Sequence, residues 1–412
     1  MAQIDETVMH GRVSGYCDAK FQAIADSFVT NFNERGEVGA SVCVRTEGEA
    51  VVDLWGGRFS TDSDKVWDKD TVSIIFSCTK AATALCAHLL IDRGELDLNA
   101  PVTRYWPEFG TNGKEDVTVL MMLNHSAGLP AFREPIKEGG YYDWDYMIKR
   151  LEEEEPFWQP GTRNGYHMIS FGWTVGELVR RVSGRSLGTF FREEIGEPLG
   201  LELWIGLPEE MEDRVSPMIP FVPDGTTPLS DFINALLSDP SSISALSWLN
   251  SGGHEVDSRQ AHAAEIGGGG GISNARSLSR MFVPLANQGR YASQQVISAE
   301  AIARMSQISM ATQMDATLLI PTRFALGFMK SMDNRNGKPG NTDSAILGDA
   351  AFGHVGAGGS IGFADPDEKL AFAYTMNRMG QGILLNERGQ SLVDSTYRSL
   401  GYRTDEPGIW IK

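Results

Sequence analysis

Apolar residues at helical spacing and short alternating runs follow one another at the start of the chain. In Asp18 to Glu34, apolar side chains recur every three or four positions, which predicts an amphipathic helix that ends at Gly36. Gly39 to Arg45 and Ala50 to Trp55 alternate around a Glu47-Gly48 turn, which predicts a β-hairpin. We therefore expect the chain to open with a helix packed on a sheet.

Helical spacing dominates the middle of the chain. An alanine- and leucine-rich segment from Ser77 to about Asp92 predicts a helix that Gly94 ends. Residues 267–271 are five glycines, and Asn274 then caps a further apolar helix that runs to about Asn287. We interpret the glycines as a tight turn where backbone approaches other backbone, and not as a domain boundary.

Residues 206–266 are rich in proline, aspartate and serine. A helical pattern is visible only around Ser230 to Leu237. Since long irregular segments in compact proteins are commonly functional, this segment is predicted to form a loop or lid that shapes a pocket mouth.

The last third of the chain returns to strand patterns. Strands are predicted at Phe324 to Met332, Ala351 to His354, Ser360 to Asp365 and Leu370 to Asn377, followed by a helix over about 383–400. Strands at both ends and helices between them predict a mixed α/β fold, in which an antiparallel sheet is flanked by helices. Residues 1–75 and 267–412 would form the sheet part and 76–266 an inserted, mostly helical part, together one catalytic unit.

Composition narrows the possible functions. The chain has 412 residues, is 42% hydrophobic, and carries a formal net charge of −18, which opposes binding to nucleic acid or to an anionic membrane. Its four cysteines, Cys17, Cys43, Cys78 and Cys86, fit no metal-ligand spacing and are predicted to be small buried residues. We therefore predict no metal and no cofactor.

The polar N-terminus, Met1 to Val13, has no apolar core segment, and no run approaches the roughly 18 apolar residues of a membrane span. We expect a soluble, cytoplasmic protein without a membrane partner. The sequence carries no signal for the number of subunits.

A candidate nucleophile stands at the start of the helix predicted from Ser77. The pattern Ser77-x-x-Lys80 places a serine and a lysine on one helical face, about 5 to 6 Å apart at Cβ. Serine needs an adjacent base to become nucleophilic, and lysine serves as one when its surroundings lower its pKa. Taken alone, the pattern is equally compatible with an ordinary amphipathic helix.

Two further residues are candidates for proton transfer. Tyr166 follows a glycine-rich turn and precedes an apolar helix, which would let it reach into a cleft, although packing is its alternative role. His125, in Asn-His-Ser-Ala-Gly, could act as a base, but histidines in such turns more often orient loops by hydrogen bonds.

Two serines compete with Ser77 for the role of nucleophile. Ser186 and Ser360 both stand in the pattern Gly-x-Ser-x-Gly, which requires a strand, a sharp turn and a helix, with Asp and His following in the sequence. More strand follows Ser360, and His354 precedes it. We therefore interpret Ser360 as part of a strand edge.

Several of these motifs occur together in the order seen in serine β-lactamases and penicillin-binding-like proteins. They are Ser77-Cys-Thr-Lys80, Leu123-Asn-His125-Ser-Ala-Gly128, Pro160-Gly161 before Tyr166, Pro198-Leu199-Gly200-Leu201, the glycine turn before Ile272-Ser273-Asn274, and His354-Val355-Gly356. Within that superfamily the chain most resembles the class C β-lactamase-like carboxylesterases, or family VIII esterases, over roughly residues 15 to 400.

The resemblance implies a β-lactamase/DD-peptidase-like fold and assigns roles to the candidate residues. Ser77 would be the nucleophile, Lys80 its base partner and Tyr166 the proton shuttle for the leaving group. The backbone N–H groups of Ser77 and Ala357 would form the oxyanion hole, with Gly356 beside them on the strand.

Departures from the β-lactamase pattern bear on the substrate. Met168 stands where β-lactamases have an acyl-amide-binding asparagine, and His354-Val355-Gly356 replaces Lys-Thr-Gly, which binds a substrate carboxylate. Both changes weaken recognition of β-lactams and peptides. Four aromatic residues are candidates for the lining of an apolar pocket, with His125 nearby, although each aromatic side chain is individually more typical of core or loop packing. They are Tyr141, Tyr142, Trp144 and Trp248.

The predicted function is hydrolysis of small-molecule carboxylic esters with short to medium acyl chains, through an acyl-enzyme on Ser77. Three alternatives stay open: a β-lactamase or D-amino-acid peptidase of the same fold, an acyltransferase, and a non-catalytic binding or scaffold protein that kept the fold.

Overall fold

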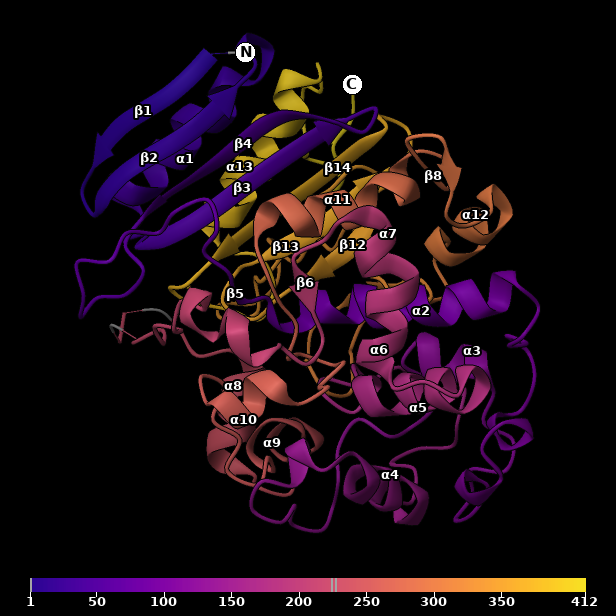
Figure 1. Ribbon diagram of the computed structural model, residues 1–412. Coiled ribbons are helices and arrows are strands. Elements are labelled where there is room, and N and C mark those ends of the chain that lie inside the picture. The colour runs from indigo at the N-terminus through magenta and orange to yellow at the C-terminus, as the bar shows by residue number, and fades with distance from the viewer. Residues whose placement is uncertain (1, 224, 227) are drawn as a thin grey trace.

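A seven-stranded sheet is the largest element of the computed structural model, which describes residues 2–223, 225–226 and 228–412 (Figure 1). The strand order is β1-β2-β4-β3-β14-β13-β12, and every neighbouring pair is antiparallel. The strands span Ala2–Val8 (β1), Gly11–Cys17 (β2), Gly39–Thr46 (β3), Glu49–Gly57 (β4), Phe352–Val355 (β12), Ile361–Asp365 (β13) and Leu370–Met376 (β14).

The two ends of the chain meet in the middle of this sheet. β3 pairs with β14, so that Val42 lies opposite Tyr374. The predicted hairpin is β3 and β4, and the predicted mixed α/β fold with an antiparallel sheet is confirmed. The pair β1 and β2 escaped prediction because this hairpin lies at the sheet edge, where β1 buries only Ile4 and Val8.

Helices cover both faces of the sheet. The first and last long helices, α1 (Gln22–Glu34) and α13 (Glu387–Ser399), pack against each other on one face, and α11 (Ala275–Ala286) lies across β13, β14 and β3 on the other (Figure 1). The predicted glycine turn delivers the chain to α11: the N–H of Gly271 donates to Thr79 Oγ1.

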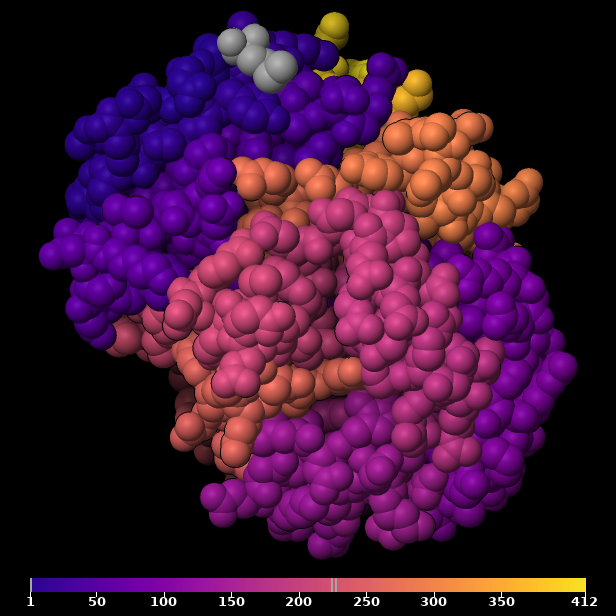
Figure 2. Space-filling view, in the orientation of Figure 1, coloured from indigo at the N-terminus to yellow at the C-terminus, as the bar shows by residue number. Residues whose placement is uncertain are grey.

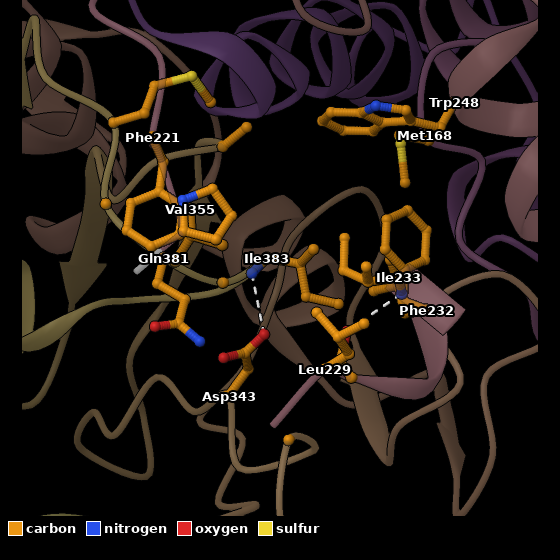
Figure 3. A pocket seen from close by; sticks show the side chains of 18 of the residues that line it. Met168, Phe221, Leu229, Phe232, Ile233, Trp248, Asp343, Val355, Gln381 and Ile383 are labelled. Carbon is orange, nitrogen blue, oxygen red and sulfur yellow. Dashed lines mark hydrogen bonds between the residues drawn. The ribbon is translucent and has the colours of Figure 1, made fainter. Parts of the chain in front are cut away.

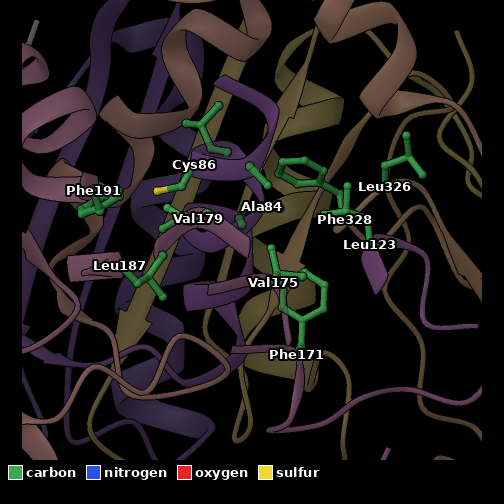
Figure 4. Close-up of a cluster of buried hydrophobic side chains, with 14 of the residues drawn as sticks. Ala84, Cys86, Leu123, Phe171, Val175, Val179, Leu187, Phe191, Leu326 and Phe328 are labelled. Carbon is green, nitrogen blue, oxygen red and sulfur yellow. The ribbon is translucent and has the colours of Figure 1, made fainter. Parts of the chain in front are cut away.

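A helical region lies below α11 (Figure 1). Its centre is α2 (Thr79–Asp92), which is buried on nearly all sides and packs on α5 (Phe171–Ser183) and α6 (Leu187–Phe191). Figure 4 shows this core, in which Cys86 of α2 and Val179 of α5 lie among apolar side chains. All four cysteines are buried and free, as predicted.

Shorter elements complete the fold. The remaining α-helices are α3 (Val119–Leu123), α4 (Trp144–Glu153), α7 (Glu197–Leu199), α8 (Asp231–Ser238), α9 (Ile243–Leu249), α10 (Arg259–Ala263) and α12 (Ala299–Ser306). The remaining strands are β5 (Ser73–Ile74), β6 (Leu203–Trp204), β7 (Ile272–Ser273), β8 (Arg290–Tyr291), β9 (Gln294–Gln295), β10 (Met310–Thr312) and β11 (Thr322–Phe324). A small sheet, β5-β7-β6, ties the helical region to the segment before Ser77. The division of the chain into parts at residues 75/76 and 266/267 stays a prediction.

The strand predicted from Phe324 to Met332 is wrong over most of its length. β11 ends at Phe324, and the chain then reverses at Gly327, where φ is 84° and Ala325 N–H donates to the carbonyl of Phe328. Apolar residues in this turn are buried against α2 and α5 because the turn lies inside the molecule. Their hydrophobicity therefore reflects burial and not strand pairing.

The segment 206–266 contains more structure than its composition predicted. Besides the helix predicted near Ser230, which is α8, it forms α9 and α10. In Figure 2 the rose-coloured middle of the chain forms much of the visible face, below the indigo N-terminal strands. Among the described residues, no helix combines the length and apolar character needed to cross a membrane.

Candidate functional site

Ser77 lies in a short 3-10 turn, Phe76–Cys78, which leads directly into α2. Its predicted position at a helix start is therefore confirmed to within one turn. Phe76 adopts a left-handed conformation with φ of 44°, which non-glycine residues rarely occupy outside constrained functional sites. This turn directs Ser77 toward a pocket that its side chain helps to line.

Lys80 lies one turn after Ser77 and is completely buried. Its Nζ lies 3.0 Å from Ser77 Oγ and donates hydrogen bonds to the carbonyl oxygens of Met168 at 2.5 Å and Gly268 at 2.6 Å. Burial lowers the pKa of Lys80 well below its ordinary value of 10.5, because desolvation disfavours the charged ammonium form. The structure therefore favours a neutral amine beside Ser77.

Tyr166 completes the predicted catalytic group of Ser77, Lys80 and Tyr166. Its ring centre lies 4.8 Å from Lys80 Nζ, and its ring stacks on Phe324. Burial raises the pKa of Tyr166 far above its ordinary value, and a hydrogen bond with Ser77 opposes this change. The phenol is consequently protonated at neutral pH and available as a proton donor.

His354 and Ala357 approach from β12 and the turn that follows it. His354 is buried, its Nδ1 donates to the carbonyl of Val355 at 2.7 Å, and its Nε2 lies 3.5 Å from Tyr166 Oη. Burial lowers the pKa of His354 to about 3, so that the ring is neutral. Ala357 lines the pocket beside Ser77, and Gly356 N–H is used in a hydrogen bond to the carbonyl of Ser360.

His125 does not reach the pocket. It is fully buried, with its ring centre 5.0 Å from that of Tyr166, and its Nδ1 accepts a hydrogen bond from the backbone N–H of His167. Its φ of 65° and its contacts fix the loop that carries Tyr166. This geometry favours the orienting role, and His125 is not among the residues that line the pocket.

The pocket beside Ser77 has a volume of about 430 Å³ and is mostly apolar (Figure 3). The predicted residues Met168 and Trp248 line it, together with side chains from the segment 206–266 and from the C-terminal part of the chain: Pro220, Phe221, Leu229, Phe232, Ile233, Leu318, Met329, Met379 and Ile383. The prediction that segment 206–266 shapes the pocket is thus consistent with the observed lining.

Three of the predicted aromatic lining residues lie elsewhere. Tyr141 packs against Trp173 and donates to the carbonyl of Asn250, and Trp144 donates to Glu177. Tyr142 contacts the ring of His254. The assignment of Tyr141, Tyr142 and Trp144 to the pocket is wrong because these rings fill the interface between α4, α5 and the segment 250–254.

The two rival serines do not have the geometry of a nucleophile elbow. Ser186 is the N-cap of α6, where its Oγ contacts Glu265 at 2.7 Å. Ser360 is fully buried immediately before β13, with its Oγ 3.5 Å from the carbonyl oxygen of Ile75. Neither serine is preceded by a strand and followed by a helix.

Asp315 is a residue near the site that the sequence did not single out. This buried carboxylate accepts hydrogen bonds from the backbone N–H groups of Tyr166, Thr317 and Leu318. It thereby fixes the backbone of the tyrosine across 149 residues of sequence. The only local signal was Asp-Ala-Thr, a pattern typical of turns in which aspartate binds the backbone two residues later.

Comparisons with known proteins agree with this geometry. The Beta-lactamase family model matches residues 21–391, and the chain belongs to this family. It is 33% identical to the Esterase/beta-lactamase LipL of Mycobacterium tuberculosis, covering 91% of this chain and 85% of that protein.

Two solved structures resemble the whole fold. A family VIII carboxylesterase is 35% identical with a TM-score of 0.81, covering 94% of this chain and 99% of the other. A penicillin-binding protein homologue from Caulobacter crescentus is 32% identical with a TM-score of 0.83, with the same coverage. The predicted resemblance to β-lactamase-like carboxylesterases is confirmed.

Proposed function

We propose that this protein is a serine carboxylesterase in which Ser77 is the nucleophile and Lys80 the general base. One observation carries the proposal. A neutral lysine has two N–H donors and one lone pair, and both donors are occupied by the carbonyl oxygens of Met168 and Gly268. The lone pair is left for Ser77 Oγ, at 3.0 Å. The amine can then accept the serine proton as the serine attacks.

Acylation follows from the positions of these groups. Ser77 Oγ attacks the ester carbonyl carbon and transfers its proton to Lys80, while the carbonyl π electrons move to oxygen. The N–H groups of Ser77 and Ala357 stabilise this oxyanion; Ser77 N–H belongs to the first turn before α2, where helix N–H groups lack helical partners. When the C–O bond breaks, the alcohol leaves with a proton from Tyr166, whose phenol then regains one from Lys80.

Deacylation reverses this path with water in place of the alcohol. Water attacks the acyl carbon and gives a proton to the same Tyr166 and Lys80 pair, and Ser77 Oγ leaves protonated. His354 acts on Tyr166 and not on the substrate: its Nδ1–H is held by Val355, so its Nε2 lone pair faces the phenol. We assign His354 as a positioning residue for Tyr166.

The apolar lining supports esters with short to medium acyl chains as substrates. A cavity of about 430 Å³ is within the range of small-ligand pockets. Met168 presents a thioether where an amide donor would be needed to hold an acyl-amide, and neutral His354 provides no fixed positive charge. These features favour an ester over a β-lactam.

Two serine variants test the proposal. Ser77→Ala should abolish hydrolysis of p-nitrophenyl butyrate, because among the described residues no other serine or threonine hydroxyl forms a hydrogen bond with Lys80 Nζ. Ser360→Ala is the matched control and should stay active, since the Ser360 hydroxyl contacts the carbonyl of Ile75 and the thiol of Cys78, and neither group takes part in the proposed reaction. Activity retained by Ser77→Ala, or lost only in Ser360→Ala, would contradict the proposal.

β-Lactam hydrolysis is a second candidate, because one relative is named both esterase and beta-lactamase. It would use the same acyl-enzyme. A chromogenic cephalosporin, assayed beside p-nitrophenyl butyrate, should be turned over with a lower kcat/KM than the ester. Faster turnover of the cephalosporin would favour the β-lactamase, and products containing a competing alcohol would indicate an acyltransferase.

A further inference from the structure

One carboxyl group faces the mostly apolar pocket beside Ser77. Figure 3 shows Asp343 at the lower edge of the pocket and Trp248 at the upper edge, with apolar side chains between them. Among the described lining residues there is no lysine, arginine or histidine, and Asp343 is the only carboxylate. A charged group on a substrate would therefore meet a potential anion at the pocket wall.

The carboxyl group of Asp343 is held in place from the backbone. Its Oδ2 accepts a hydrogen bond from Ile383 N–H at 2.9 Å, and its main-chain carbonyl accepts one from Asn334 Nδ2 at 2.8 Å. Gly382 has a φ of 95°, and a Cβ at that position would lie 2.6 Å from Asp343 Oδ1. The glycine therefore leaves the space that the carboxyl group occupies.

Within residues 2–223, 225–226 and 228–412, Asp343 also has no neutralising partner. No ion pair to Asp343 is found there, and the Ile383 N–H is the only hydrogen bond to its side chain. A carboxylate has about four acceptor positions, so most of its capacity is unused. Burial raises the pKa of Asp343, and a cation bound next to it would oppose that change.

We propose that Asp343 makes this pocket selective for esters that carry a cationic group, such as a quaternary ammonium or a protonated amine. This inference rests on the proposed ester hydrolysis at Ser77. The carboxylate attracts the cation, and the aromatic faces of Phe221, Phe232 and Trp248 in the same pocket add a favourable surface for a weakly hydrated ammonium. An ester that carries a carboxylate would be disfavoured by Asp343 and by the net charge of −18.

A pair of isosteric esters isolates the effect of charge. Butyrylcholine and 3,3-dimethylbutyl butyrate share their acyl group and shape, and differ only in that a carbon atom replaces the quaternary nitrogen. Release of butyric acid, followed by titration at constant pH, gives kcat/KM for both. The ratio of kcat/KM for the cationic ester to kcat/KM for the neutral ester should be about tenfold lower in Asp343→Asn than in the wild-type protein. This change is expected for the loss of one partly desolvated charge pair.

Asp349→Asn is the matched control, because Asp349 lies six residues further on, is exposed, and does not line the pocket. It removes the same charge from the protein and should leave the ratio unchanged. An unchanged ratio in Asp343→Asn, an equal fall in both variants, or an equal loss of both esters in Asp343→Asn would overturn the inference. Hydrolysis of both esters by Ser77→Ala would instead refute the proposed function.

Discussion

A buried histidine far from Ser77 should make the protein sensitive to acid. His88 lies inside α2, where its Nε2–H donates to the carbonyl of Leu326 at 2.8 Å and its ring stacks on Phe328. Its Nδ1 has no hydrogen-bond partner among the described residues. Burial lowers the pKa of His88 from 6.5 to about 4, because a charged imidazolium would lose its hydration there.

The sign of the effect follows from proton binding. As the pH falls below 6.5, His88 binds a proton in the unfolded chain, whereas in the folded protein it stays neutral until about pH 4. The unfolded state binds more protons in this window, so the free energy of unfolding falls as the pH falls from 6.5 toward 4. Above pH 6.5 His88 is neutral in both states, so it no longer lowers the free energy of unfolding.

The magnitude can be worked from the same values. At pH 5, about 1.5 pH units below the unfolded pKa, His88 should lower the free energy of unfolding by about 2 kcal/mol. Burial also lowers the pKa of His167 to about 4 and of His354 to about 3. Together the three histidines should lower the free energy of unfolding at pH 5 by about 6 kcal/mol. This is a large share of the 5–15 kcal/mol by which folded proteins are typically stable.

Urea unfolding at pH 7.5 and pH 5, followed by circular dichroism, measures this loss. In His88→Gln, the side chain can still donate to Leu326 but does not titrate, so the loss between the two pH values should be about 2 kcal/mol smaller than in wild type. His10→Gln, at a partly exposed position, is the control. It should have a much smaller effect on the fall in the free energy of unfolding between pH 7.5 and pH 5. Equal losses in wild type and His88→Gln would refute the reasoning.

Two buried ionisable residues, Lys80 and Glu37, provide further tests. Lys80→Ala should lower kcat for p-nitrophenyl butyrate by about 10²- to 10⁴-fold, whereas Lys20→Ala, at an exposed position, should leave kcat unchanged. The activity of the wild-type protein should rise with pH through the lowered pKa of Lys80, because only the neutral amine is a base. A similar loss of kcat in both variants would contradict the role of Lys80 as the base. Glu37→Gln should lower the free energy of unfolding by about 3 kcal/mol, because it removes the counter-charge of the buried Arg388, whose Nη1 lies 2.7 Å from Glu37 Oε1. An unchanged midpoint of urea unfolding would contradict this prediction.

The central part of the site was predictable because its residues are set by local sequence and by ordered motifs. Ser77 and Lys80 are joined by helix geometry over three residues, and their proximity is observed. Tyr166 lies on a different segment, and only its order relative to the other motifs indicated that it would join them. The structure brings all three together.

Residues that act through long-range contacts escaped prediction. Asp315 and Asp343 approach the site only after the chain folds, and neither stands in a motif that singles it out. The aromatic residues Tyr141, Tyr142 and Trp144 show the opposite error, because aromatic side chains favour a core and a pocket equally. Hydrophobicity alone could not distinguish the two locations.

The same limit applies to secondary structure. The turn at Gly327 carries apolar residues because it is buried, so its sequence has the composition of a strand. The edge hairpin of β1 and β2 is a strand pair that the sequence pattern did not reveal. Its polar side chains face solvent, although its backbone pairs with β4 through β2.

A covalent acyl-enzyme at Ser77 is the central intermediate of the proposed reaction. Intact-mass spectrometry of wild-type protein, quenched in acid during turnover of p-nitrophenyl butyrate, should show a species heavier by one butyryl group, and peptide mapping should place that group on Ser77. Ser77→Ala should show no such species, whereas Ser360→Ala should still form it. An acyl group on any other residue, or ester turnover by Ser77→Ala, would contradict the account.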